Sequence, residues 1–192
     1  MAALDFPPEL LVKAQGSGLA AKLALFAVDG VLTDGRRYIG DRGETLQAFS
    51  TLDGHGLRLL QQAGIVPVIV TGHDSPAVRR LVADLGVQHA LCGVSDPRAA
   101  VETLLQQLGA TWGEVAAIGA DWPDLPLLAG AGFAAAPPGA HAEVRAVAHH
   151  VTQAAAGAGA VREVCDLLLM AAGRYQRLLH AHHDPRDGEA AP

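Results

Sequence analysis

The chain has 192 residues, a net charge of −6 and a pI near 5.8. This length is enough for one α/β domain with its own core, and the acidic balance argues against nucleic acid or an anionic membrane as a partner. No apolar stretch approaches the roughly 20 residues of a membrane span, and the N-terminus lacks the pattern of a signal peptide. We expect a cytoplasmic protein in which Cys92 and Cys165 are reduced core thiols.

Short apolar runs alternate with helical patterns along most of the chain. Residues 1–20 are expected to form an N-terminal arm or short helix, residues 21–180 a single domain, and residues 181–192 a polar, disordered tail. The alternation predicts an α/β fold, a doubly wound, Rossmann-like parallel sheet with helices on both faces. Strands are expected at 22–28, 65–71, 87–92, 115–118 and 132–136, and helices at 53–63, 75–86, 96–109, 124–129, 140–147 and 160–180.

One segment interrupts this alternation. Residues 36–49 contain the sequence GDRG (40–43) between two strand-like pieces, which predicts a β-hairpin that projects beyond the first strand. Ligands of parallel sheets bind beyond the carboxyl ends of the strands. The candidate functional residues are therefore expected in the loops at 27–33, 71–75, 93–98 and 119–124.

The first of these loops follows the apolar run LFAV (25–28) and reads DGVLTDG (29–35), which resembles the first motif of the haloacid dehalogenase superfamily of phosphatases. Further segments resemble one branch of it, the capless 3-deoxy-D-manno-octulosonate 8-phosphate (KDO 8-phosphate) phosphatases. They read FSTLDGHG (49–56), VTG (70–72), GADWPDLP (119–126) and GAVREVCD (159–166). The resemblance covers residues 23–179, and several matches in the right order are more specific than one short pattern.

The resemblance implies a haloacid dehalogenase-like fold without a cap domain. It implies the magnesium-dependent hydrolysis of KDO 8-phosphate to KDO and phosphate in lipopolysaccharide synthesis. It also implies a homotetramer, in which the hairpins associate and residues of a neighbour close each active site. The expected partners are a phosphosugar ligand and further copies of the chain.

The nucleophile of this family is an aspartate at the end of the first strand, and Ala27 stands at its position. A methyl group can neither attack phosphorus nor bind a metal. Asp29 matches the acid/base that shuttles the proton, and its backbone carbonyl is expected to face the metal. Asp29 also suits a purely structural role, because an aspartate before a glycine favours a turn.

Phosphate binding in the family is implied for Thr71 and Gly72. His73 stands where the family commonly has arginine, so substrate binding there is expected to be weakened or pH-dependent. The lysine of the third motif is replaced by Pro97, and Arg98 is the nearest substitute. One residue along a helix turns a side chain by roughly 100°, which weakens that substitution.

The metal site of the family is altered in the same way. The fourth motif normally begins Gly-Asp-Asp, and here it reads Gly-Ala-Asp, with Ala120 at the position of a metal-binding aspartate. Asp29 and Asp121 remain as weak metal candidates, and Asp124 matches a residue that supports the loop. Magnesium prefers carboxylates and substrate phosphate, so its binding is predicted to be weak or lost.

These substitutions predict a catalytically disabled, pseudophosphatase-like protein, either a homo-oligomeric scaffold or a binding protein. One alternative is an active sugar-acid phosphatase that uses Asp29, Asp121 or Asp124. A second is an engineered, inactive form of an active enzyme. Two residues also keep two interpretations: Asp53 begins a helix or contacts substrate, and Arg162 forms a surface salt bridge or reaches a neighbour's pocket.

Overall fold

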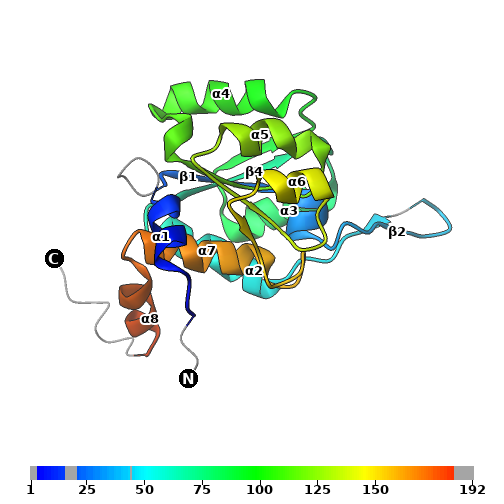
Figure 1. Cartoon of the computed structure of the whole chain (residues 1–192). Helices are drawn as coiled ribbons and strands as arrows, with labels where there is room; N and C mark the ends of the chain where they lie inside the picture. The colour runs from blue at the N-terminus through cyan, green and yellow to red at the C-terminus, as the bar shows by residue number, and fades with distance from the viewer. Residues whose placement is uncertain (1–3, 16–20, 44, 184–192) are drawn as a thin grey trace.

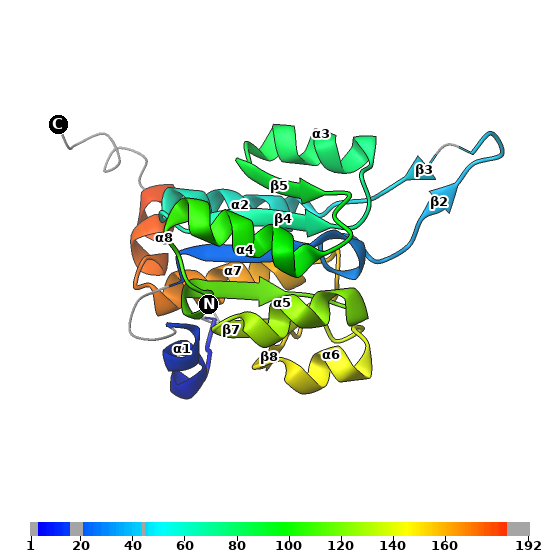
Figure 2. The ribbon, with the colours of Figure 1, turned by 90° about the horizontal axis from the view of Figure 1, so that it is seen from above.

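A six-stranded parallel sheet forms the centre of the protein, whose computed structural model describes residues 4–15, 21–43 and 45–183. The strand order is β5-β4-β1-β6-β7-β8, and every neighbouring pair is parallel (Figure 2). The strands are β1 (Leu23–Ala27), β4 (Val66–Thr71), β5 (His89–Cys92), β6 (Val115–Ile118), β7 (Phe133–Ala136) and β8 (His150–Val151). The predicted doubly wound α/β fold is confirmed.

Helices cover both faces of the sheet. α2 (Thr51–Gln62) and α7 (Ala160–Ala171) lie on one face, while α4 (Pro97–Leu108) and α5 (Leu125–Gly130) lie on the other (Figure 1). α1 (Pro8–Ala14) and α8 (Tyr175–His183) pack against α7. The remaining helices are α3 (Pro76–Leu85), α6 (Ala142–Val147) and the single turns η1 (Val28–Leu32), η2 (Trp112–Glu114) and η3 (Trp122–Asp124). No helix of the described residues is long and apolar enough to cross a membrane.

β1 owes its central position to its composition. All five of its residues, LALFA, are buried, because an interior parallel strand is covered on both faces and therefore reads as a continuous apolar run. It pairs with β4 on one side and β6 on the other. β4 and β6 thus lie on opposite sides of β1, and the order in which the chain adds strands reverses there. Folds of this kind bind ligands at such a switch point.

Two predicted helix starts and stops are confirmed. Ser75 accepts a hydrogen bond from the amide of Val78 at the start of α3, and Asp96 accepts one from the amide of Ala99 at the start of α4. Gly86 and Gly109 end these helices in the left-handed conformation, where a glycine has no steric penalty.

The predicted hairpin forms and extends away from the rest of the protein (Figures 1 and 2). β2 (Tyr38–Ile39) pairs with β3 (Thr45–Leu46) in antiparallel register. Tyr38, Ile39 and Leu46 are 51%, 71% and 71% exposed. The hairpin therefore presents apolar side chains that the described chain leaves uncovered.

The prediction of a single helix at 160–180 is wrong. Gly173 adopts a left-handed φ of 65°, which divides the segment into α7 and α8. α8 then continues to His183, so the first residues of the segment expected to be a disordered tail are helical. The rest of that segment, 184–192, lies outside the described residues. The structure also adds β8, a two-residue strand too short to carry a sequence pattern.

Asp53 does not begin a helix. α2 starts after Ser50, and Asp53 lies inside it with only 1% of its surface exposed. Its carboxylate accepts hydrogen bonds from the amides of Gly159 (3.3 Å) and Arg162 (2.8 Å). Asp53 thus caps α7, a helix more than a hundred residues away, and holds the two helices of this face together.

We expect Asp53→Ala to lower the free energy of unfolding by about 2 kcal/mol, because two amides at the start of α7 lose their acceptor. Asp53→Asn keeps one acceptor oxygen and should lose about half as much. Ser50→Ala is the matched control, since the Ser50 side chain makes no capping bond to α2. Urea unfolding of the three variants measures the difference, and equal losses in Ser50→Ala and Asp53→Ala would contradict this role.

The Asp53 variants also test how the stability of the protein depends on pH. Burial raises the pKa of Asp53, although the amides of Arg162 and Gly159 oppose the shift. The folded protein therefore holds this proton more tightly than the unfolded chain does. Its contribution to stability is complete below the unfolded pKa and is lost as the pH rises through the folded pKa. Unfolding measured across this acidic range should show that decline in the original chain and a smaller decline in Asp53→Asn.

Candidate functional site at the carboxyl ends of the strands

The loops that follow β1, β4 and β6 meet at one edge of the sheet, as the sequence predicts. Ala27, the last residue of β1, is paired with Val70 of β4. A Cβ atom on Gly30 would lie 3.0 Å from Cβ of Ala120, so the first and fourth motifs are in contact. The first, second and fourth motifs therefore form a common site around the end of β1.

The loop after β1 is held in shape by the backbone and by one buried hydroxyl. Gly30 has a φ of 75°, which favours glycine. Thr33 is fully buried, and its hydroxyl donates to the carbonyl oxygen of Val28 at 3.2 Å. The hydroxyl oxygen of Thr33 accepts hydrogen bonds from the amides of Gly30 and Gly35 at 3.4 and 3.2 Å. The turn that carries Asp29 is thus fixed independently of any ligand.

Asp29 is paired with side chains of two other segments. Its Oδ2 atom lies 3.2 Å from Nδ1 of His73 and 3.6 Å from Nη2 of Arg37. Its Oδ1 atom accepts a hydrogen bond from Nε2 of Gln47 at 3.4 Å. Gln47 in turn accepts one from the Ser75 hydroxyl at 2.9 Å. Arg37 and Gln47 come from the two ends of the hairpin, so the hairpin is attached to the site at its base.

Arg37 and Gln47 are site residues that the sequence did not reveal. Both belong to the hairpin segment, where an arginine and a glutamine beside exposed strands are unremarkable in sequence. Their contact with Asp29 follows from the path of the chain, which leaves β1, extends into the hairpin and returns to the same edge. No local pattern carries that information.

The positions of the nucleophile and the metal aspartate are both alanine, and both side chains are nearly buried. Ala27 is 8% exposed and Ala120 9% exposed. Neither offers an oxygen atom to a ligand. Where the resemblance implies two carboxylates that face a metal and a phosphate, the site has two methyl groups.

The carboxylate of Asp124 supports the fourth loop. Its Oδ2 atom accepts the amides of Ala120 (2.8 Å) and Asp121 (3.2 Å). Burial raises the pKa of Asp124, and the negative charges of Asp121 and Asp29 add to this shift against the two amides. The space is tight, since a Cβ on Gly119 would lie 2.5 Å from Cβ of Asp124. Asp121 is exposed, and its Oδ1 atom accepts the amide of Trp122 at 2.8 Å.

The second motif lies beside this cluster and contacts the third loop, where the amide of Val94 donates to the carbonyl oxygen of Thr71 at 3.2 Å, but the Arg98 side chain is bound elsewhere. Thr71 is buried, and its hydroxyl oxygen accepts the amide of His73 at 3.1 Å across Gly72. The Arg98 guanidinium pairs with Glu102 at 3.0 Å and donates to the carbonyl oxygen of Pro126 at 3.1 Å. It also lies 5.1 Å from the centre of a Trp112 ring. These contacts engage Arg98 on α4, α5 and η2, and give no support to its substitution for the motif lysine.

The carboxylates at this edge of the sheet are engaged by protein groups. Among the described residues, no group of three or more histidine, cysteine, aspartate or glutamate side chains is placed to hold a metal ion. The Asp29 carboxylate is paired with His73, Arg37 and Gln47, and that of Asp124 accepts two amides. Magnesium is usually held in near-octahedral geometry by one or two carboxylates with waters and substrate phosphate, and both of these carboxylates already have protein partners.

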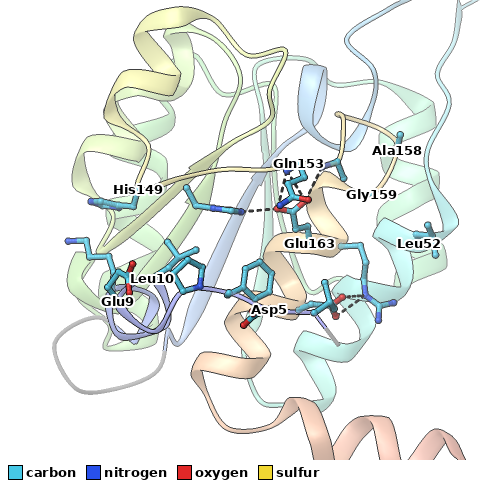
Figure 3. Close-up of a pocket in the computed structure, with 17 residues that line it drawn as sticks. Asp5, Glu9, Leu10, Leu52, His149, Gln153, Ala158, Gly159 and Glu163 are labelled. Carbon is cyan, nitrogen blue, oxygen red and sulfur yellow. Dashed lines mark hydrogen bonds and ion pairs between the residues drawn. The ribbon is translucent and has the colours of Figure 1, made fainter. Parts of the chain in front are cut away.

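One cavity is lined by none of the loop residues at 27–33, 71–75, 93–98 and 119–124. It has a volume of about 1020 Å³ and runs between the N-terminal segment, β8 and α7 (Figure 3). Two pairs of titratable groups line it: His150 contacts Glu163 at 2.8 Å, and Arg162 contacts Asp166 at 2.8 Å. Glu163 also accepts the amides of Gln153 and Ala154. These bonds hold β8 and α7 together, so the strand ends remain the candidate site.

Comparison with known proteins shows to which protein family the chain belongs. The sequence model of the haloacid dehalogenase-like hydrolases matches residues 21–132, more than half of the chain. The chain therefore belongs to this class of hydrolases. It is 39% identical over 167 residues to the 3-deoxy-D-manno-octulosonate 8-phosphate phosphatase KdsC of Salmonella typhimurium, covering 87% of each chain. It is 40% identical over 153 residues to KdsC of Escherichia coli K12, covering 80% of this chain and 81% of the relative.

Comparison with solved structures leads to the same family. A probable phosphatase of the YrbI family from Pseudomonas syringae has a TM-score of 0.88 at 36% identity, over 93% of this chain and 99% of that one. The Moraxella catarrhalis KDO 8-phosphate phosphatase, solved with a magnesium ion, a phosphate ion and KDO, has a TM-score of 0.86 at 36% identity, over 92% and 99%. Within the haloacid dehalogenase-like hydrolases, the chain is a member of the KDO 8-phosphate phosphatase family. The resemblance seen in the sequence is confirmed.

We expect Asp124→Ala to lower the free energy of unfolding by about 1–2 kcal/mol, because two amides of the fourth loop lose their acceptor in a nearly closed space. Asp121→Ala is the matched control: its side chain is exposed and accepts the amides of Trp122 and Asp124 at the start of η3, so its loss should cost about 0.5 kcal/mol. Urea unfolding of both variants measures this difference. A larger loss in Asp121→Ala would contradict the assignment of loop support to Asp124.

Proposed function

We propose that this chain is a catalytically silent member of the KDO 8-phosphate phosphatase family, which keeps the phosphatase scaffold and does not hydrolyse a phosphosugar. The observation that carries the proposal is the end of β1. Ala27 occupies the last position of this central strand, where the family resemblance calls for the attacking carboxylate. Without a nucleophile, no covalent phosphoryl intermediate can form.

The nearby carboxylates are poorly suited to replace it. Asp29 is held by His73, Arg37 and Gln47. Asp124 has its Oδ2 atom on two amides, and Asp121 caps Trp122. Each of these bonds would have to break before the group could approach a phosphorus atom in the required direction. This arrangement favours a silent site over an active phosphatase with rerouted chemistry.

The missing metal ligand strengthens the proposal. Phosphate monoesters are among the slowest compounds to hydrolyse uncatalysed, and good enzymes accelerate the reaction up to about 10²¹-fold. Magnesium supports such reactions by neutralising charge on the phosphate. A site with Ala120 in place of a metal aspartate, and with no free cation at Pro97, lacks that support. The remaining function is then to bind a phosphosugar or to act within an oligomer.

We expect no phosphate release above background from KDO 8-phosphate with excess magnesium. The triple variant Ala27→Asp, Ala120→Asp, Pro97→Lys should restore release, whereas Ala27→Asp alone should do little, because the groups act as a unit. Malachite-green or coupled detection of free phosphate measures each rate. A version of the original chain with Asp29→Asn, purified in parallel, reveals any contaminating host phosphatase. Magnesium-dependent turnover by the original chain that disappears in Asp29→Asn would overturn the proposal.

We further propose that the chain assembles through its hairpins into a homotetramer. The support is the uncovered apolar surface of Tyr38, Ile39 and Leu46 on a hairpin that extends away from the sheet. Exposed apolar groups gathered in this way mark protein contacts.

Ile39→Lys with Leu46→Lys should therefore shift the molar mass in size-exclusion chromatography with light scattering from a tetramer to smaller species. Both side chains are mostly exposed, so folding should not change. Asp41→Lys, in the exposed turn of the same hairpin, is the control for a charge added nearby. An unchanged tetramer in the double variant would show that the hairpin is not the assembly surface, and a monomeric original chain would exclude the assembly.

A further inference from the structure

Asp29, Arg37 and His73 form a compact group at the centre of the candidate site. Nη2 of Arg37 lies 3.1 and 3.0 Å from the two ring nitrogens of His73, and Nδ1 of His73 lies 3.2 Å from Oδ2 of Asp29. With the ring hydrogen on Nδ1, His73 donates to Asp29 and accepts from Arg37. Arg37 is thus the cation that balances the charge of Asp29.

We propose that this group is a metal-independent binding site for a tetrahedral oxyanion such as phosphate. Arg37 supplies the positive charge, Arg37 and His73 supply hydrogen-bond donors, and the Asp29 carboxylate is an internal anion that the ligand displaces. The inference rests on the proposed function, since it takes the residual role of a silent site to be binding.

The chemistry of the donors supports this assignment. A guanidinium presents planar, paired N–H donors that match two oxygens of a phosphate or a carboxylate. Arg37 is 45% exposed and His73 63% exposed at their side chains, so both can reach a ligand from solvent. The Thr71 hydroxyl lies in the same loop, where its oxygen accepts the amide of His73, and its hydrogen is available for an oxyanion.

The role of Asp29 is reversed relative to a magnesium site. Where a metal is bound, an aspartate helps to assemble the charge that attracts phosphate. Here the described residues place no metal-binding cluster, so the Asp29 charge can only repel an oxyanion and compete with it for Arg37. Removing this carboxylate should therefore strengthen phosphate binding, which is the opposite of its effect in a metal-dependent site.

The test is calorimetric titration with inorganic phosphate at fixed pH, with EDTA or with excess magnesium. We expect the same affinity in both buffers, about tenfold tighter binding in Asp29→Asn, and at least tenfold weaker binding when Arg37→Met is added to Asp29→Asn. Asp34→Asn is the matched control, because it removes the same charge from the same loop, and the Asp34 side chain accepts the amide of Arg36 and forms no hydrogen bond or ion pair with Arg37 or His73 among the described residues. Its effect should be twofold or less.

Several results would overturn the inference. They are binding that requires magnesium, weaker or unchanged binding in Asp29→Asn, an equal gain in Asp34→Asn, and no binding by either the original chain or Asp29→Asn. Binding that appears only in Asp29→Asn supports it, since the internal anion then outcompetes the ligand. Thermal unfolding verifies that each variant is folded, and Arg37→Met in the original chain provides a second test. Inorganic phosphate cannot be hydrolysed, so this result is independent of whether the chain releases phosphate from an ester.

Discussion

The parallel pairing of β1 with β4 and β6 is the constraint on which the site depends. Parallel strands all end at the same edge, so residues that are far apart in sequence are brought together by backbone hydrogen bonds alone. Ala27, Thr71 and Ala120 each follow or end one of these strands. The geometry of the site is therefore a property of the sheet, and it persists when the reactive side chains change.

The substitutions separate two classes of residue. Asp53, Thr33 and Asp124 bond to backbone groups, and removing any of these side chains takes a hydrogen-bond partner from each backbone group that it contacts. The aspartates implied at positions 27 and 120 would instead face a ligand, and their negative charges would repel one another without a metal. Replacing them with alanine costs the fold little and can stabilise it. The fold of the chain therefore does not depend on carboxylates at positions 27 and 120.

Much of this structure was predictable from sequence. The strands, the caps at Ser75 and Asp96 and the hairpin follow from local patterns, because apolar runs, capping side chains and glycines act on their neighbours. Asp53 and Arg37 were not predictable, since their partners lie in distant segments and depend on how the chain packs. The break at Gly173 was missed for a different reason: one glycine within an apolar helical pattern is often tolerated, and only the left-handed backbone shows that it ends the helix.

The shape of the first loop does not depend on a carboxylate at position 27. The turn around Gly30 is set by its positive φ, by the Thr33 hydroxyl and by the contact with Ala120, none of which uses a catalytic carboxylate. The backbone of the loop therefore keeps the form that a nucleophile at position 27 would need. Substituting aspartate there would not require the main chain to rearrange. Pro97 differs, because it begins α4 at a position where proline is favoured. Aspartate at position 27 or 120 would therefore leave the backbone in place, whereas lysine at position 97 would remove the proline that begins α4.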